Sequence, residues 1–474
     1  MQKTLFLKSL ITAVLAMALL VPLSMIHSTV YERQARQASV VQEVAASTAG
    51  AQTLGGPVLV FPYTLEWTEV VLEDTSGAPA TASNRARREY QRRSEGRWVV
   101  LPSEAEWETQ AATDYKRRGL FKALVYDLAA KVTGRFEVPA EPALPGLREG
   151  VRLVWGAPFV SVLITDTRGL SSAPRMTLDG RSLTFRNGSG LAAMADGIRA
   201  ELDGVKPGST LSLPFTLSLS VRGTECLSFI PLAETTRVGL SSAWPHPSFS
   251  GSFLPTPRDQ QIGPDGFSAR WEITALAAKA PAAFVTAARD GALCEGACRE
   301  SFGVRLVEPI NIYSMSDRAL KYGFLFVALS FAAFFLFELL KSLRIHPAQY
   351  LLVGLALALF FLLLLSLSEH IPFGLAYGIA AGASIALQGF YLSYVLHGVA
   401  RGIGFAGLLA ALFGALYGLL VSEDMALLIG SVLLFGLLAL VMVITRRLDW
   451  YGLRPLDPDL SLDLDLEPDN SRQA

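Results

Sequence analysis

One apolar stretch decides the fold of this chain: residues 322–340, which read YGFLFVALSFAAFFLFELL. A helix needs about 20 predominantly apolar residues to cross the hydrocarbon core of a bilayer. This stretch has that length, so we predict a transmembrane helix here. Four further stretches of the same kind follow in close succession: residues 349–367, 373–392, 403–421 and 425–444.

Only one comparable stretch precedes it, residues 9–26, and a long polar region separates the two. Lys3 and Lys8 followed by an apolar run are typical of a secretory signal peptide. The run is longer than a usual signal-peptide core, however, and no clear small-x-small cleavage site follows it before the charges begin. We therefore interpret it as an uncleaved anchor and predict six transmembrane helices, with a large domain between the first and the second.

The short loops between the C-terminal helices alternate between basic and acidic residues. Basic loops stay in the cytoplasm, so both chain ends are expected there and the large domain on the opposite side. Arg318 and Lys321 oppose this assignment, but charges beside a long translocated domain count for little. The predicted organisation is residues 1–27 for the N-terminus and first helix, 28–317 for the external domain, 318–448 for a five-helix bundle and 449–474 for a tail.

Composition agrees with a membrane protein. Charged residues make up only 18% of the chain against 51% hydrophobic residues, and the formal net charge of −1 gives no basis for binding nucleic acid. The tail is acidic, with Asp alternating with Leu and Pro over residues 457–467, and is expected to be disordered.

The external domain is predicted to be β-rich, which makes the whole chain an α+β membrane protein. Residues 210–221 alternate apolar and polar side chains, the pattern of a strand with one face on a core and one in water. Short runs bounded by Gly and Pro suggest further strands and a sandwich-like fold. Residues 32–49 are expected to continue the first helix outward as a stalk.

An arginine-rich segment, residues 84–97, interrupts this pattern. One interpretation is a docking segment for anionic lipid headgroups or an acidic partner. The interpretation that we favour is a solvated, flexible insertion between strands.

The chain has three cysteines, Cys226, Cys294 and Cys298, all in the predicted external domain. In an oxidising compartment Cys294 and Cys298 are candidates for a disulfide, which leaves Cys226 unpaired and buried. A single C-x-x-x-C without a nearby His is poor evidence for zinc.

Motifs that carry catalytic chemistry are absent from the sequence. It has five histidines and contains no H-E-x-x-H, phosphate-binding loop, G-x-S-x-G or paired C-x-x-C. We therefore expect no enzyme activity, no cofactor and no metal site.

Polar residues near or within the predicted membrane helices are the remaining candidates, because burying a charge in lipid is costly. Glu338 lies near the inner end of the second helix, where Lys341 is one turn away and suits an ion pair. Glu369 and His370 follow the third helix, where they either carry protons or cap the helix and contact the external domain. Gln388 is expected to hydrogen-bond a neighbouring helix.

Several strings of this sequence, in order, resemble the CreD family of bacterial inner-membrane proteins. The resemblance covers nearly the whole chain. The strings are GGPVLVFP (55–62), RRGLFKALVY (117–126), TDTRG (165–169), SAWPHPSF (242–249), GSFLP (251–255), DRALKYGFLFVALSFAAFFLFE (317–338), RIHPAQYLLVG (344–354) and LSLSEH (365–370).

The resemblance implies an inner-membrane location, a periplasmic external domain and expression under the Cre two-component system. It also implies a part in envelope integrity, colicin tolerance and the response to β-lactam stress. The family has no established catalytic residues, so the resemblance implies none here.

The family strings also have a physical interpretation. His346 and Pro347 fit a helix start, since Pro in the first turn sacrifices no hydrogen bond. The two prolines around His246 make an extended, rigid segment that positions Trp244 and Phe249 as apolar anchors. We expect these anchors to pack internally, the alternative being that they face a partner.

A second string contains two opposite charges, Asp166 and Arg168, which we expect to form a buried structural pair rather than a ligand site.

The sequence thus predicts a non-enzymatic inner-membrane protein of envelope homeostasis that acts by binding through its external domain. Expected partners are membrane lipids and a periplasmic or inner-membrane protein. The alternative is a transporter or lipid-handling protein, in which Glu338, Glu369, His370 and Gln388 line a path.

Overall fold

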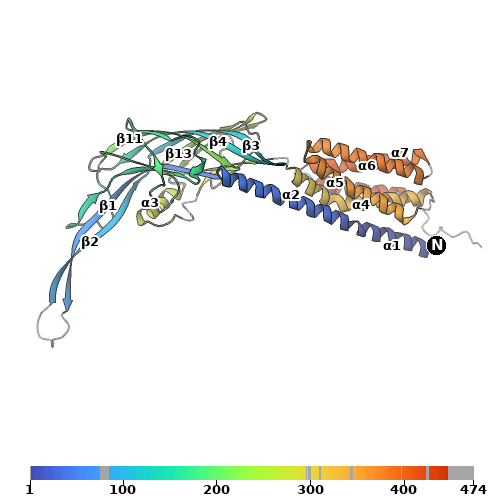
Figure 1. Cartoon of the computed structure of the whole chain (residues 1–474), viewed down its shortest axis with the longest axis horizontal. Helices are drawn as coiled ribbons and strands as arrows, with labels where there is room; N and C mark the ends of the chain where they lie inside the picture. Colours follow the sequence, from blue (N-terminus) through green and yellow to red (C-terminus); the bar gives the residue numbers. More distant parts are fainter. Residues whose placement is uncertain are drawn as a thin grey trace, which may run out of the picture. The chain divides into compact units, whose positions relative to one another are not determined.

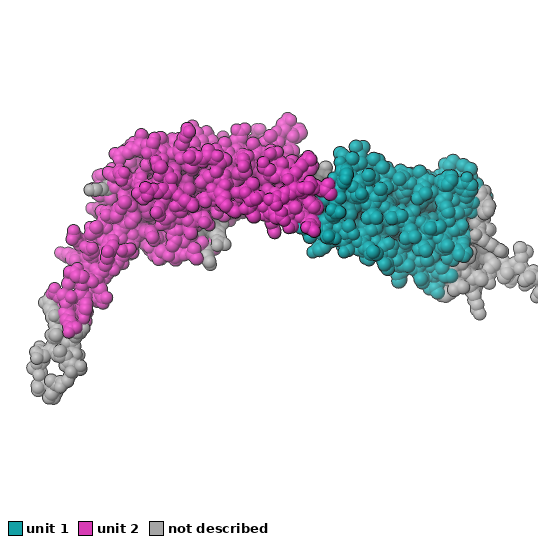
Figure 2. Space-filling view, in the orientation of Figure 1, with its two compact units in different colours: residues 1–35, 310–474 teal, residues 36–309 magenta. Residues whose placement is uncertain are grey.

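The computed structural model describes residues 2–74, 85–142, 144–205, 207–294, 296, 300–308, 311–341, 345–396, 398–422 and 426–446. The chain divides into two compact units, coloured separately in Figure 2. The helical unit comprises residues 1–35 and 310–474, and the β-rich unit comprises residues 36–309.

The helical unit combines helices from both ends of the chain (Figure 1). The helices are α1 (Gln2–Ala18), α2 (Leu20–Ser47), α4 (Ile312–Lys341), α5 (Pro347–Ser368), α6 (Phe373–Val395), α7 (Val399–Val421) and α8 (Ala426–Thr445). Among the described residues, five helical segments are long and apolar enough to cross a membrane. They are Leu10–Ser47, Ile312–Phe335, Pro347–Ser368, Phe373–Val395 and Val399–Val421.

Each of these five segments overlaps one of the first five predicted spans, although Leu10–Ser47 extends far beyond the predicted residues 9–26 and Ile312–Phe335 begins and ends earlier than the predicted residues 322–340. The sixth predicted span, residues 425–444, coincides with α8, and its crossing of the membrane stays a prediction. The expected helical stalk at residues 32–49 is confirmed, because α2 continues as one helix to Ser47.

The start of α5 follows the sequence closely. The ring of His346 accepts a hydrogen bond from the backbone N–H of Ala348 at 3.2 Å, and the side chain of Gln349 accepts one from the N–H of His346. This capping box and Pro347 in the first turn confirm the predicted helix start.

Aromatic side chains fill the centre of the helical unit. The ring of Phe413 of α7 contacts two others, Phe326 of α4 and Phe360 of α5. In each contact the ring centroids are 4.6 Å apart. Leu359 and Leu387, in contrast, are more than half exposed. Large apolar residues on both the inner and the outer face are expected of helices in lipid.

Among the described residues, the β-rich unit contains the strands, the end of α2 from Arg36 to Ser47, the helix α3 (Ala280–Asp290) and the short 3₁₀ helix η1 (Thr167–Gly169). The strands are β1 (Gln52–Asp74), β2 (Arg85–Val100), β3 (Glu104–Arg118), β4 (Phe121–Val138), β5 (Arg152–Trp155), β6 (Phe159–Ile164), β7 (Arg175–Leu178), β8 (Arg181–Leu183), β9 (Arg186–Asn187), β10 (Ile198–Glu201), β11 (Leu211–Thr224), β12 (Cys226–Ile230), β13 (Thr235–Ser242), β14 (Pro247–Gly251), β15 (Gln260–Gly263), β16 (Gly266–Thr274) and β17 (Phe302–Leu306).

The strands form two sheets. Sheet A has the order β14-β17-β12-β1-β6-β10-β9, with β2 and β5 also paired to β1. Sheet B has the order β15-β16-β13-β3-β4-β11-β7-β8. Two sheets around a common core, in a chain that also has a helical unit, confirm the α+β architecture with a large β-rich region.

The main hydrophobic core of this unit draws on both sheets. Phe61 and Phe229 of sheet A belong to the same buried cluster as Trp107, Phe136 and Phe215 of sheet B. The expected alternation is confirmed in β11, where buried and more exposed residues alternate along most of the strand. One face of sheet B therefore packs on the core, and the other is solvated.

Helix α3 covers the other face of sheet A. Its fully buried Phe284 clusters with Val58, Val60 and Leu163 of that sheet. Sheet A is thus covered on both faces in this region, and the open face of the unit belongs to sheet B.

The arginine-rich segment was wrongly expected to be a flexible insertion. It is strand β2, paired with β1 in continuous antiparallel register from Leu59↔Val100 to Asp74↔Arg85. Opposite charges across the ribbon support the pairing, as between Arg92 and Glu69 at 2.6 Å. Beyond Glu66, where the pairing with β5 ends, β1 pairs only with β2 among the described strands, and the two form an arm (Figure 1).

The main hydrophobic core predicts a large effect of truncating Phe136. Its buried ring lies 5.0 Å from that of Phe215, so Phe136→Ala leaves a cavity and should cost about 3–5 kcal/mol of stability. Urea unfolding of the purified protein, followed by tryptophan fluorescence, measures the loss. Leu276→Ala, at a fully exposed leucine, is the matched control. Equal midpoints for the two variants would contradict the core assignment.

Candidate functional site

Family strings lie near the two ends of the β-rich unit, at places that we call the first and the second junction. The first junction, residues 46–52, comprises the end of α2, which belongs to the β-rich unit from Arg36 onward, and the start of β1. The second junction, residues 307–308, follows β17 and precedes α4. The following contacts all lie within the β-rich unit.

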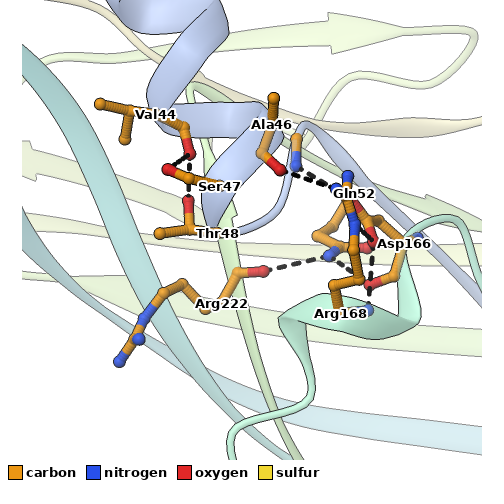
Figure 3. A network of polar contacts seen from close by, with 9 residues as sticks. Val44, Ala46, Ser47, Thr48, Gln52, Asp166, Arg168 and Arg222 are labelled. Atoms are coloured by element: carbon orange, nitrogen blue, oxygen red, sulfur yellow. Dashed lines mark hydrogen bonds and ion pairs between the residues drawn. The ribbon is translucent and has the colours of Figure 1, made fainter.

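An ion pair holds the first junction (Figure 3). Arg168 donates through Nε to Asp166 at 2.9 Å and through Nη2 at 2.7 Å, which makes the pair bidentate. Its Nη1 also donates to the backbone carbonyl of Ala46 at 2.7 Å. Asp166 in turn accepts from the backbone N–H of Gly50. The pair therefore ties the end of α2 to the 3₁₀ turn η1.

The buried side chain of Gln52 completes this junction. Its Nε2 donates to the carbonyl oxygens of Asp166 at 2.9 Å and Arg222 at 3.0 Å, and its Oε1 accepts from the N–H of Asp166. A Cβ atom at Gly169 would collide with the Arg222 carbonyl and the Gln52 amide, so this position requires glycine. All the polar side-chain atoms of Gln52 are therefore engaged within the junction.

The predicted pairing of Asp166 and Arg168 is confirmed, but its predicted burial is wrong for Arg168. The arginine side chain is 61% exposed, and that of Asp166 is 16% exposed, because η1 lies at the surface. Hydrogen bonding to the guanidinium of Arg168 lowers the pKa of Asp166 below its ordinary value.

Aromatic residues hold the second junction. Nε1 of Trp244 donates to the carbonyl oxygen of Val307 at 3.1 Å, and the N–H of Val307 donates to the carbonyl oxygen of His246 at 3.2 Å. Tyr115 donates its hydroxyl to Glu308 at 3.3 Å and packs edge-on against Trp244. Burial, together with Glu308, raises the pKa of Tyr115 to about 12, so its hydroxyl stays a donor.

The predicted apolar anchors pack internally. Phe249 contacts Phe267 and Trp271 with ring centroids 5.8 and 5.6 Å away, and both Phe249 and Trp244 pack against the main core. The ring of His246 is exposed beside Trp244. These contacts fix the second junction from within the β-rich unit.

Glu369 lies at the C-terminal end of α5, within the helical unit. Its Oε1 accepts from the hydroxyl of Tyr313 at 3.2 Å and lies 3.6 Å from Nε of Arg33. Glu369 is the C-cap residue of α5, as one interpretation expected, and the two partners named here belong to the helical unit rather than to the external domain. His370 is exposed. A second pair, His27 with Asp317 at 3.1 Å, also joins α2 to α4.

Glu338 of α4 is buried, with 7% exposure. One carboxylate oxygen accepts from the hydroxyl of Tyr350 at 2.8 Å and the other from the N–H of Ile345 at 3.2 Å. The side chain of Lys341, its predicted partner, lies outside the described residues.

Gln388 of α6 is 1% exposed, and its Nε2 donates to Ser384 at 2.9 Å, one turn away on the same helix. Among the described residues, the predicted hydrogen bond to a neighbouring helix is not found, and the amide bonds within its own helix instead. Its Oε1 is one of the buried polar atoms without a hydrogen-bond partner among the described residues.

The structure describes two of the three cysteines, Cys226 and Cys294. Cys226 is a free, half-buried thiol, and Cys294 is disulfide-bonded. Cys298 lies outside the described residues, so the predicted Cys294–Cys298 bond stays a prediction. No group of three or more metal-ligating side chains occurs among the residues that the structure describes.

A groove crosses the solvated face of sheet B. Two adjoining open cavities of about 630 and 440 Å³ share Glu108, Thr109 and Ser241 in their walls. The strand register places one row of the face across the groove: Arg270, Gly239, Glu108, Lys131, Ser218 and Arg175. The next row is Ser268, Ser241, Gln110, Ala129 and Ser220. The groove floor thus has small and hydroxyl side chains, between charges of both signs.

Sequence reasoning missed Gln52, Tyr115 and this groove. Gln52 and Tyr115 lie a few residues before the family strings at 55–62 and 117–126. This closeness to the strings was the one sequence feature that could have indicated a structural role for them. The groove arises from the pairing of distant strands, and no local pattern marks it.

Apolar helices and a two-sheet β-rich unit define the class: a multi-pass membrane protein with a large inserted domain. The profile of the family described as "Inner membrane protein CreD" matches residues 4–451. The curated Inner membrane protein CreD of Escherichia coli (strain K12) is 34% identical over 435 residues, covering 92% of this chain and 91% of that protein. This chain belongs to the CreD family of inner-membrane proteins.

Solved structures match only in part. An M1 zinc metallopeptidase from Deinococcus radiodurans is 12% identical, with a TM-score of 0.17, and the match covers 36% of this chain and 38% of that one. The secretin InvG of the Salmonella SPI-1 type III secretion injectisome is 9% identical, with a TM-score of 0.06, over 40% of this chain and 69% of that one. Neither likeness carries an argument about fold or function.

The ion pair at the first junction predicts a pH-dependent stability. The lowered pKa of Asp166 stabilises the fold fully above the ordinary value of 3.8, and this contribution is lost as the pH falls through the lower folded-state value. Because Arg168 is largely exposed, solvent screens the pair and the contribution is small. Unfolding midpoints measured into the acid range should converge for wild type and Asp166→Asn. A constant difference between them would contradict the ion pair.

The second junction predicts a specific role for the indole N–H of Trp244. Trp244→Phe retains an aromatic ring beside Tyr115 but leaves the Val307 carbonyl without this donor, which should cost about 1 kcal/mol. Hydrogen exchange at residues 307–308 should accelerate. His246→Ala, which removes an exposed ring and leaves the backbone bond in place, is the control and should change neither quantity.

Proposed function

We propose that this protein serves cell-envelope homeostasis without catalysis, by binding a polar, extended envelope component in the groove on sheet B. The membrane helices anchor the β-rich unit, which lies in the periplasm. The alternation of basic and acidic loops supports this orientation. The resemblance to CreD proteins supports a part in colicin tolerance and the response to β-lactam stress.

The groove is the observation that carries this proposal. It is open, it spans several strands, and its small side chains leave room for an extended ligand. Its hydroxyl groups and its charges of both signs suit a polar chain with hydrogen-bonding groups rather than an apolar one. The family strings at 165–169 and 242–249, in contrast, are engaged in holding the junctions.

Filling the groove tests the proposal. Ala129→Trp places a large side chain on an exposed position of its floor, so binding should fail while the fold is retained. Thr177→Trp, at an exposed position of β7 in the same sheet but outside the groove lining, is the matched control. Each variant is returned to cells that lack the protein, and colicin and β-lactam susceptibility and abundance are measured.

Loss of tolerance in Ala129→Trp alone, at normal abundance, is the expected result. The same comparison identifies the component, because a molecule that co-purifies with wild type and Thr177→Trp should be lost from Ala129→Trp. Full tolerance in both variants would contradict binding at this groove.

A second candidate function, transport or lipid handling by the helices, rests on Gln388. A buried amide oxygen without a partner costs free energy and therefore suggests a polar species passing or resting beside it. The buried carboxylate of Glu338 is a further polar group inside the helical unit.

Gln388→Leu separates the two functions. It removes the unpaired amide oxygen, so under the binding proposal it should leave tolerance unchanged and raise the thermal stability of the protein. Both functions predict the raised thermal stability, but they differ in tolerance. Transport predicts that Gln388→Leu loses tolerance although the protein is present at normal abundance. Glu338→Gln tests the second polar site in the same way. It removes the charge but keeps a side-chain oxygen that can accept the hydrogen bond from the hydroxyl of Tyr350.

A further inference from the structure

The turn between β3 and β4 carries an unusual combination of side chains. The hairpin tip, residues 116–122, reads KRRGLFK and contains four cations. Gly119 has a positive φ of 60°, which suits the tight turn. Leu120 at the apex is 52% exposed, although it is a large apolar residue in a strongly basic segment.

Like charges face each other across this hairpin. The register pairs Arg117 directly with Lys122, and such a pair destabilises an antiparallel ribbon. Arg118, by contrast, is paired with Glu43 of α2 at 2.7 Å. No ion pair is formed by Lys116 or Arg117 within the part of the chain that the structure describes. An anion bound at Arg117 and Lys122 would remove the repulsion between them.

The chain itself limits how far the tip is from a membrane span. Tyr115, the residue before the tip, is hydrogen-bonded to Glu308. Glu308 precedes Ile312, the first residue of the span Ile312–Phe335, by four residues, which extend at most about 14 Å. Lys122 lies 5.7 Å from the ring centroid of Tyr115, so the basic residues remain close to this point.

We propose that the hairpin tip docks on the anionic phospholipid headgroups of the membrane in which the chain is embedded. Leu120 enters the boundary between headgroups and acyl chains, and Arg117 and Lys122 bind lipid phosphates. An exposed apolar side chain among cations is the composition that favours an anionic membrane surface. Soluble anions offer the phosphate chemistry without the apolar layer that Leu120 requires. This inference does not depend on the groove of sheet B.

The experiment uses the full chain in lipid nanodiscs, with an environment-sensitive fluorophore on Leu120→Cys in a Cys226→Ser background. Discs of phosphatidylglycerol with phosphatidylethanolamine are compared with discs of phosphatidylcholine. The expected result is blue-shifted emission, quenched by spin-labelled acyl chains, in the anionic discs alone. High salt should weaken it, since salt screens exposed charges. The same label on Leu254→Cys, at a loop leucine of 65% exposure, should not respond.

Arg117→Glu separates docking from a structural role. It replaces the repulsive pair with an opposite-charge pair to Lys122, so the stability of the β-rich unit should be equal or higher, while the lipid-dependent shift is lost. A lowered stability together with an unchanged shift would overturn the proposal. Emission that is the same in both kinds of disc would also overturn it. A shift produced in phosphatidylcholine discs by inorganic phosphate would assign the tip to a soluble anion instead.

Discussion

The β-rich unit is inserted between two membrane helices, so its chain must come back to the membrane that it left. Gln52 meets this constraint with a single buried amide. It bonds the carbonyls of Asp166 and Arg222, which lie 114 and 170 residues further along the chain. A buried amide is costly unless all its groups are bonded, and here the protein supplies every partner. The first strand therefore begins at a point that the later chain also fixes.

This arrangement separates anchoring from recognition. The family strings at 165–169 and 242–249 form the two junctions. Asp166 and Arg168 bond each other in the first junction, and Trp244 bonds the carbonyl of Val307 in the second. On the solvated face of sheet B, by contrast, the side chains of Glu108, Lys131 and Ser218 are exposed to solvent. Where α3 packs, sheet A is covered by that helix on one face and by the core on the other. Within the described residues, the solvated face of sheet B has no such cover over its groove residues.

The sequence predicted the features that depend on local pattern. Apolar length located five membrane spans, alternation located β11, and His346 with Pro347 located the start of α5. It failed at β2, because arginine-rich composition does not resemble a strand and only pairing with β1 makes it one. It placed Asp166 beside Arg168 but gave no sign of Gln52, whose role arises from residues that are distant in sequence. Burial was misjudged for Arg168 for the same reason.

The arm formed by β1 and β2 has a consequence for how this protein can change. From Trp67 and Arg92 outward, the described ribbon rests on no third strand, and Glu69, Val70 and Tyr90 are exposed. Lengthening or shortening it removes cross-strand pairs without opening a cavity in the core. Its length and charge are therefore decoupled from the stability of the sheets. The arm can vary from one relative to another while the rest of the β-rich unit keeps its packing.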